Sequence, residues 1–161
     1  MIYLAGPFFN EVEASNMEFL EQTCDKLDIR YFSPRKGENS KQFGKAMRDP
    51  GIARSVKEEL AEGVFRDNVE YITESQIILA VIDGRDTGTM WEIGYAFALE
   101  VPVVTITFQD FGLNIMIGKC SHGHFRGKES IETMLSTIAI LPAADTLSQI
   151  ESMSDPKGDM I

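Results

Sequence analysis

Three carboxylates stand close together in residues 77–95, which read IILAVIDGRDTGTMWEIGY. A run typical of a buried strand leads to Asp83, a glycine-containing turn carries Asp86, and Glu92 stands in the first turn of the helix predicted from Thr89 to Leu99. Open parallel sheets bind ligands at the carboxyl ends of their strands, so we expect the three carboxylates to lie together at the rim of such a crevice. Carboxylates there suit chemistry on a cationic or developing-cation centre, or a metal.

Glu92 has the features of a nucleophile. The unpaired backbone N–H groups and the positive dipole end of a first helical turn stabilise a carboxylate as an anion, so we expect Glu92 to be ionised. If its target is the anomeric carbon of a sugar, the product is a glycosyl-enzyme ester that a second acceptor resolves with retention. The alternative is that Glu92 is one of the acidic residues common at helix starts, without a chemical role.

Patterns for other chemistries are missing from the sequence. AGPFFN follows the first predicted strand in place of GxGxxG, and there is no Walker pattern. His122 and His124 lie in a glycine-rich stretch, and such a pair alone is more typical of a surface loop than of metal ligands. Cys24 and Cys120 are too few for a disulfide framework and fit a reducing cytoplasm, where we expect them to act as small hydrophobic residues.

The composition limits the possible partners. A chain of 161 residues with 43% hydrophobic residues is long enough for one domain with a sizeable core. Its net charge of −10 argues against binding to polymeric DNA or RNA, but a small substrate in a local pocket is compatible with it. No apolar run approaches the roughly 20 residues that span a bilayer, and the MIYLAG start argues against export, so we expect no membrane and a cytoplasmic location.

Alternating helices and strands predict a doubly wound α/β domain with a sheet of about five strands. The polar segment 35–51 is predicted to be a mobile flap or an ordinary surface loop. We expect a single domain over residues 1–147 and a weakly ordered tail over residues 148–161. The predicted strands are residues 2–5, 29–32, 76–82 and 103–108, and the predicted helices are residues 11–27, 53–74, 89–99 and 130–138.

Four motifs give the chain a resemblance to the nucleoside 2-deoxyribosyltransferases over roughly residues 1–118. They are IYLAGPFFN at residues 2–10, SPR at 33–35, DTGTMWEIGYA at 86–96 and LNIM at 113–116, and DTGTxWExG is the most specific. The resemblance implies a flavodoxin-like fold with mainly parallel strands. It also implies an enzyme of nucleoside salvage that moves 2-deoxyribose between nucleobases by a ping-pong route, without a metal or cofactor. Its substrates would be deoxynucleosides and free nucleobases, and it would form a homo-oligomer with shared active sites.

The resemblance also implies roles for individual residues. Glu92 matches the nucleophile that attacks C1′ of the deoxyribose, and Tyr3 matches a tyrosine that orients this glutamate. Asp86 matches the aspartate that accepts a hydrogen bond from the sugar 5′-hydroxyl. Asn114 matches an asparagine that a neighbouring subunit contributes to the sugar pocket.

The base site contains one departure from the family pattern. Phe8 and Phe9 match aromatic positions that line this site, with plain core packing as the alternative. The family carries Asn-Asp before the third strand, and its aspartate protonates the departing base; this chain has Asp67-Asn68. At about 100° per residue, Asp67 points away from the helix face that Asn68 shares with Ile72. We therefore expect Asn68 to contact the base, although an amide has no proton to give at neutral pH.

Two other functions are possible at this point. Related 2-deoxynucleoside 5′-phosphate N-hydrolases use water as the acceptor, but an ionised Asp86 would repel a 5′-phosphate by several kcal/mol at low effective dielectric. A non-catalytic nucleoside-binding protein is compatible with Asn68 in place of the acid. Transfer between bases is the function that the resemblance favours.

Overall fold

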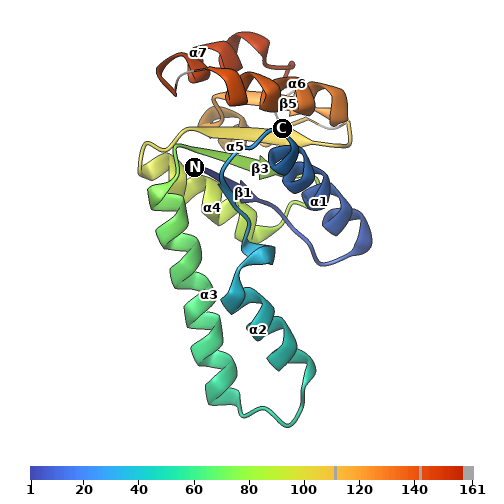
Figure 1. Ribbon diagram of the computed structural model, residues 1–161, viewed down its shortest axis with the longest axis vertical. Coiled ribbons are helices and arrows are strands. Elements are labelled where there is room, and N and C mark those ends of the chain that lie inside the picture. The colour runs from blue at the N-terminus through green and yellow to red at the C-terminus, as the bar shows by residue number, and fades with distance from the viewer. Residues whose placement is uncertain (111, 142, 158–161) are drawn as a thin grey trace.

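The computed structural model describes residues 1–110, 112–141 and 143–157. Its centre is a five-stranded parallel sheet with the strand order β2-β1-β3-β4-β5 (Figure 1). This topology confirms the predicted flavodoxin-like α/β fold with a single sheet. The strands are β1 (Ile2–Ala5), β2 (Tyr31–Phe32), β3 (Ile77–Val81), β4 (Val103–Thr107) and β5 (Gly123–Arg126).

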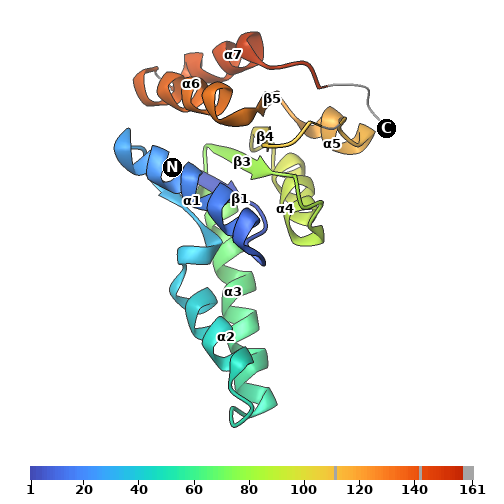
Figure 2. The ribbon, with the colours of Figure 1, turned by 90° about the vertical axis from the view of Figure 1, so that its right-hand side faces the viewer.

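Helices cover both faces of the sheet (Figure 2). Helices α1 and α6 lie on one face, and α3, α4 and α5 lie on the other. No helix in the described part of the chain combines the length and apolar character needed to cross a membrane. The helices are α1 (Glu11–Lys26), α2 (Glu38–Arg48), α3 (Arg54–Glu74), α4 (Thr87–Ala98), α5 (Ile115–Cys120), α6 (Gly127–Ile140) and α7 (Ala143–Met153), with a 3-10 turn at Pro34–Lys36.

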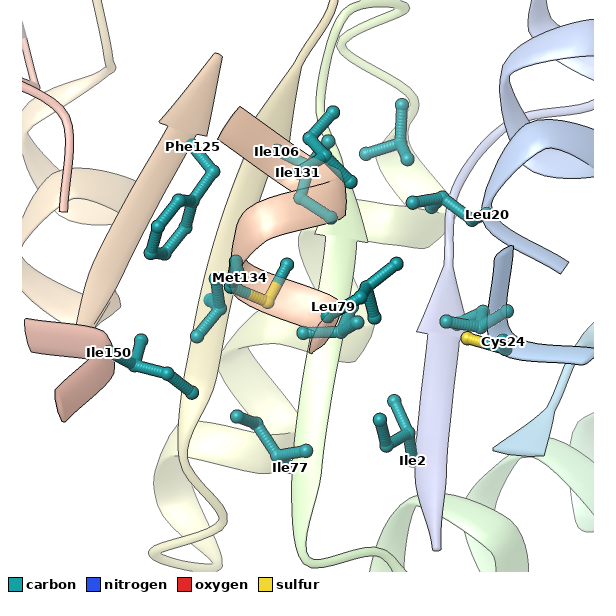
Figure 3. Close-up of a cluster of buried hydrophobic side chains, with 14 of the residues drawn as sticks. Ile2, Leu20, Cys24, Ile77, Leu79, Ile106, Phe125, Ile131, Met134 and Ile150 are labelled. Carbon is teal, nitrogen blue, oxygen red and sulfur yellow. The ribbon is translucent and has the colours of Figure 1, made fainter. Parts of the chain in front are cut away.

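Alternation along the strands divides the core into two clusters. On β1, Ile2 and Leu4 pack towards α1, whereas Tyr3 packs towards α3 and α4, because successive strand side chains point to opposite faces. Figure 3 shows the first cluster, in which Cys24 of α1 is buried among aliphatic side chains, as predicted. The second cluster carries Tyr3 and therefore adjoins the acidic stretch that follows β3.

The prediction of a flap or loop over residues 35–51 is wrong, because α2 occupies most of this segment. Helices α2 and α3 pack together as a hairpin that projects from the sheet (Figure 1). Asn39 of α2 donates a hydrogen bond from Nδ2 to Asp67 Oδ2 of α3 at 2.8 Å. The helix buries little of its surface, with Ala46 as its one buried residue, so its sequence lacks the long apolar stripe that identifies a core helix.

Strand β5 was missing from the predicted elements, and it changes the interpretation of His124. The expected surface position is wrong for this residue, which is fully buried. Its Nδ1 lies 3.1 Å from Thr105 Oγ1 and its Nε2 lies 3.4 Å from Thr107 Oγ1 on β4. These contacts make the ring part of a polar network between β4 and β5, and burial lowers the pKa of its imidazole. His122 is half-buried, and its Nδ1 accepts a hydrogen bond from the Val103 backbone at 3.3 Å.

The expected weak order after residue 147 is wrong for residues 148–153, which belong to α7. Ile150 of this helix is fully buried and packs into the first cluster. Residues 154–157 follow α7 and form a C-terminal strap beside β5. Residues 158–161 of the predicted tail lie outside the described residues.

Hydrogen bonds hold the C-terminal strap along β5. The Asp155 backbone N–H donates to His124 O at 2.7 Å, and its Oδ2 accepts from Arg126 N at 2.8 Å and Ser130 Oγ at 2.6 Å. Lys157 Nζ donates to Gly118 O at 2.8 Å at the end of α5. The strap is therefore hydrogen-bonded to β5, to the first turn of α6 and to the end of α5.

The amino ends of the central strands are tied together by the first residue. The Met1 ammonium group donates to Gln76 Oε1 at 3.1 Å, and Met1 O accepts from the Gln76 backbone N–H at 3.0 Å. These bonds place Met1 at the edge of the sheet where the parallel strands β1 and β3 begin.

Candidate active site

Glu92 and Tyr3 form a hydrogen-bonded pair inside the molecule. The Tyr3 hydroxyl donates to Glu92 Oε1 at 2.5 Å. Tyr3 is fully buried on β1, and Glu92 on α4 is 8% exposed. Burial, followed by the Glu92 charge and hydrogen bond, raises the pKa of Tyr3, so its hydroxyl keeps its proton and acts as a donor to the carboxylate.

Asn68 of α3 reaches the same carboxylate. Its Nδ2 lies 3.4 Å from Glu92 Oε1. Its Oδ1 is buried and has no hydrogen-bond partner among the described residues. Asp67 is held by Asn39 and points elsewhere, as the helical spacing predicts. The structure thus places an amide, not a carboxylic acid, beside Glu92.

The charge state of Glu92 differs from the expectation. Helix α4 begins at Thr87, so Glu92 is its sixth residue and lies beyond the first turn, where free N–H groups would stabilise an anion. Burial raises the pKa of Glu92 to about 7; the hydrogen bond from Tyr3 lowers it and the charge of Asp86 raises it. The prediction of a helix-start anion is therefore wrong, and near neutral pH the carboxyl group is divided between its two forms.

Asp86 and Asp83 have different surroundings. Asp86 is the N-cap of α4, and its Oδ2 accepts from Thr89 N at 2.8 Å and Thr89 Oγ1 at 3.0 Å. Asp83 turns towards β4, where its carboxylate accepts from Phe108 N at 2.9 Å and Gln109 N at 2.8 Å. The prediction that all three carboxylates share one rim is thus wrong for Asp83, which joins the ends of β3 and β4.

Glu92 lines a pocket of about 590 Å³ at the carboxyl ends of β1 and β3. The apolar side chains come from the β1–α1 loop and from the facing sides of α2 and α3. In the loop, Phe8 and Phe9 stack with ring centroids 5.3 Å apart. Both line the pocket, so core packing does not explain them. The other large apolar lining residues are Phe43, Met47 and Val64.

The polar side chains of the pocket surround this apolar surface. Asn68, Asp86 and Glu92, three of the predicted site residues, line it together. Ser40 and Arg48 also line it, and the sequence interpretation missed them because residues 35–51 were expected to be irregular. The signal was present as the helical spacing of Ser40, Phe43, Met47 and Arg48 on one side of a helix.

Asn114 is not brought to this pocket. It is exposed at the start of α5, where its Oδ1 accepts a hydrogen bond from Met116 N at 2.9 Å. The described residues contain no cluster of three His, Cys, Asp or Glu side chains arranged to hold a metal ion. What the pocket offers is a buried carboxylate with a phenol donor, beside an apolar space wide enough for a planar ring.

Comparisons with known proteins identify relatives of the chain. The family model described as nucleoside 2-deoxyribosyltransferase matches residues 2–124. A solved 2-deoxyribosyltransferase from the psychrotolerant bacterium Bacillus psychrosaccharolyticus, described as a biocatalyst for nucleoside synthesis, has a TM-score of 0.68 and 27% identity, with 90% of this chain and 94% of that chain covered.

A conserved protein from Enterococcus faecalis V583 has a TM-score of 0.50 and 22% identity, with 94% and 96% of the two chains covered, and supports the fold alone. No curated protein matches the chain. With most of its length matched by the family model and a similar solved transferase, the chain belongs to the nucleoside 2-deoxyribosyltransferase family and is a transferase enzyme.

Proposed function

We propose that the enzyme moves 2-deoxyribose from one nucleobase to another in two half-reactions, with Glu92 as the covalent carrier. The observation that supports this mechanism is the buried Glu92 at the pocket wall with Tyr3 bonded to one of its oxygens at 2.5 Å. Deoxynucleosides and free nucleobases are the substrates. The ping-pong order follows from a carrier that must release one base before it takes the next.

The two oxygens of Glu92 have different tasks in this mechanism. Oε1 is engaged by Tyr3 and Asn68. Oε2 has no hydrogen-bond partner among the described residues, so it is the oxygen that attacks. The C1′–Oε2 bond forms as the C1′–N bond breaks, and the electron pair goes to the base nitrogen. A second base then attacks C1′ through a ring nitrogen, loses the proton of that nitrogen to water, and displaces the carboxylate.

Asp86 gives the sugar its position. Its Oδ2 is engaged by Thr89, whereas its Oδ1 has no hydrogen-bond partner among the described residues and accepts from the 5′-hydroxyl. A 5′-phosphate dianion would meet this negative charge, which favours a free 5′-hydroxyl over a phosphorylated substrate. Phe8 and Phe9 provide flat apolar surface for the base, and Asn68 hydrogen-bonds its edge.

We further propose that the active enzyme is a homo-oligomer in which a neighbouring subunit supplies Asn114. In one chain Asn114 is exposed and stands outside the Glu92 pocket. Exposed apolar side chains, including Trp91 at 45% exposure, lie on α3, α4 and α5 around this region and offer a surface for a second copy. The oligomer is expected in the cytoplasm, in nucleoside salvage.

The Glu92→Gln variant tests the covalent mechanism. Gln keeps the size of the side chain but removes the nucleophilic oxygen, so transfer from a deoxynucleoside to a different free base should fall about a thousandfold or more. With wild-type enzyme, intact-protein mass spectrometry after mixing with a deoxynucleoside should show the added mass of one deoxyribosyl group, localised to Glu92.

The matched control is Glu70→Gln, an exposed glutamate of α3 outside the pocket, which should retain wild-type transfer. Undiminished transfer in a folded Glu92→Gln protein would contradict the mechanism. Release of free deoxyribose without any exchange product would instead identify a hydrolase, and binding without either product would identify a nucleoside-binding protein.

A further inference from the structure

Arg48 brings a positive charge to the wall of the Glu92 pocket. It is the last residue of α2 and lines the Glu92 pocket, where it is the one positively charged residue among the described lining residues. Its two terminal guanidinium nitrogens lie 3.9 Å from the point where a Cβ on Gly44 would stand. The side chain therefore folds back along α2, in the direction that helical side chains favour, over a residue that leaves room for it.

No ion pair or hydrogen bond to another described residue accounts for this arginine. Arg48 is exposed, and it makes no ion pair or hydrogen bond within the part of the chain that the structure describes. Other arginines have such partners: Arg35 pairs with Glu21 at 2.6 Å, and Arg126 pairs with Asp110 at 2.6 Å. The five N–H donors of Arg48 are thus available to a ligand.

The proposed reaction creates a need for such donors. When the C1′–N bond breaks, the electron pair leaves with the base and its negative charge spreads over ring nitrogens and carbonyl oxygens. Asn68, next to Glu92, cannot give this base a proton. Glu92 and Asp86, the two carboxylates of the pocket, disfavour an anion there. A fixed positive charge near the base would offset both effects.

We propose that Arg48 stabilises the departing base by donating hydrogen bonds to it, in place of an acid at position 68. The inference rests on the proposed transferase mechanism. Arg48 shares its wall with Phe43 and Met47, the apolar surface suited to a planar base, while the sugar lies towards Asp86 at the start of α4. The base leaves as an anion held by the guanidinium, which keeps its own proton, and water protonates the base afterwards.

Leaving-group dependence of the rate tests this role. Two pairs of substrates differ mainly in the acidity of the base: 2′-deoxyuridine with 5-fluoro-2′-deoxyuridine, and 2′-deoxyguanosine with 8-aza-2′-deoxyguanosine. The pair from the base class with the faster wild-type turnover is used, and kcat/KM is measured for wild type, Arg48→Gln and Arg48→Lys. Arg48→Gln should lower kcat/KM about 10- to 100-fold for the substrate with the less acidic base. The loss in kcat/KM for the substrate with the more acidic base should be smaller by a factor of at least about three.

Arg48→Lys keeps a charge and should recover part of the loss. The control is Lys45→Gln, which removes one positive charge from an exposed position on the same helix outside the pocket and should leave both rates within about twofold. Thermal unfolding of each variant shows that the comparison is made on folded protein. In an Arg48→Gln background, Asn68→Asp should restore activity, because it introduces an acid for the base.

Three results would overturn the role of Arg48. They are an equal loss for both bases of the pair, rates as in Lys45→Gln, or a loss confined to 5′-monophosphate substrates. Separate measurements test the role of Arg48 and the covalent mechanism. Absence of the glycosyl adduct on wild-type Glu92 overturns the proposed function, whereas a normal adduct with unchanged leaving-group dependence in Arg48→Gln overturns only the inference about Arg48.

Discussion

Glu92 has to combine two opposed properties. A nucleophilic carboxylate must be ionised, yet a glycosyl ester needs a site protected from water, and burial raises the pKa of Glu92 to about 7. The Tyr3 hydrogen bond opposes this rise by stabilising the anion at Oε1. The pair thus allows a buried carboxylate to remain partly ionised near neutral pH without engaging the oxygen proposed to react.

The rate should therefore depend on pH through Glu92. Because only the ionised form attacks, kcat/KM for the first half-reaction should fall about tenfold per pH unit as the pH falls below about 7, and should level off above it. A pH-rate profile between about pH 5 and 9 measures this, with substrates whose bases do not titrate in that range.

The Asp86→Asn variant tests whether the acid limb of the pH-rate profile, the fall of kcat/KM at low pH, is due to Glu92. The negative charge of Asp86 raises the pKa of Glu92, so its removal should move the acid limb to lower pH, while Asn still caps α4. The absolute rate should fall as well, because Asp86 is proposed to hold the sugar. An acid limb that stays in place would assign the titration to another group.

At the level of single residues, the sequence was informative about identity and less so about environment. The acidic stretch in residues 77–95 was sufficient to nominate Glu92 and Asp86, whereas Tyr3 was nominated by the resemblance to the family. The protonation of Glu92 was not predictable, because it depends on burial between elements distant in sequence. Asp83 shows the same limit, since its partners are the backbone N–H groups after β4.

At the level of elements, the strands at the centre of the sheet and the amphipathic helices α1 and α3 were predicted well, whereas α2 and β5 were missed. Strands β1, β3 and β4 are runs of buried residues and were recognised directly. Strand β5 has four residues, with Gly123 and His124 at its start, so neither periodicity nor composition marks it. Helix α2 was missed because it contributes its apolar residues to a pocket and not to the core.

Helix α7 gives a test of how firmly the end of the chain is attached. Ile150 is fully buried, and its Cγ2 fills the space beside Gly123. Ile150→Ala should lower the free energy of unfolding by about 2–5 kcal/mol, because it leaves a cavity between α7 and β5. Urea unfolding followed by circular dichroism measures the change.

Ile140→Ala is the matched control, because Ile140 is 80% exposed on α6 and its truncation should change the free energy of unfolding by no more than about 0.5 kcal/mol. Equal effects of the two substitutions would show that α7 is loosely attached, as the composition of the tail suggested.

At the level of the whole molecule, one surface is unusually rich in exposed rings. Phe65 of α3 lies 5.5 Å from Trp91 of α4 between ring centroids, and Trp91 stacks on Tyr95 at 5.0 Å. Ile115 and Met116 of the neighbouring α5 are also exposed, next to Asn114. Apolar patches of this kind are typical of interaction surfaces.

Substitution of this surface tests the shared site. Wild type should be a homo-oligomer in solution scattering, and Trp91→Arg should dissociate it, because an arginine cannot be buried there without a partner. Ile140→Arg, which places the same charge on an exposed isoleucine of α6, should leave the assembly intact. A wild-type monomer at high concentration would contradict the proposal.

Mixing of variants gives a second readout of shared sites. Glu92→Gln and Asn114→Ala should each be inactive or weak alone, because each damages every site. After mixing and exchange of subunits, part of the activity should return, since one site of a mixed assembly then has both native residues. If the activity after mixing equals the mean of the two variants, Asn114 of one subunit does not complete the site that contains Glu92 of another.

The attachment of Met1 to Gln76 has a practical consequence. These residues lie where β1 and β3 begin, whereas Phe8, Asp86 and Glu92 follow the opposite ends of the same strands. A resin attached through the amino terminus would therefore lie at the edge of the sheet where β1 and β3 begin. The pocket at the opposite ends of these strands would stay open to nucleosides. Immobilised in this way, the catalyst should keep its affinity for small molecules in a flow reactor.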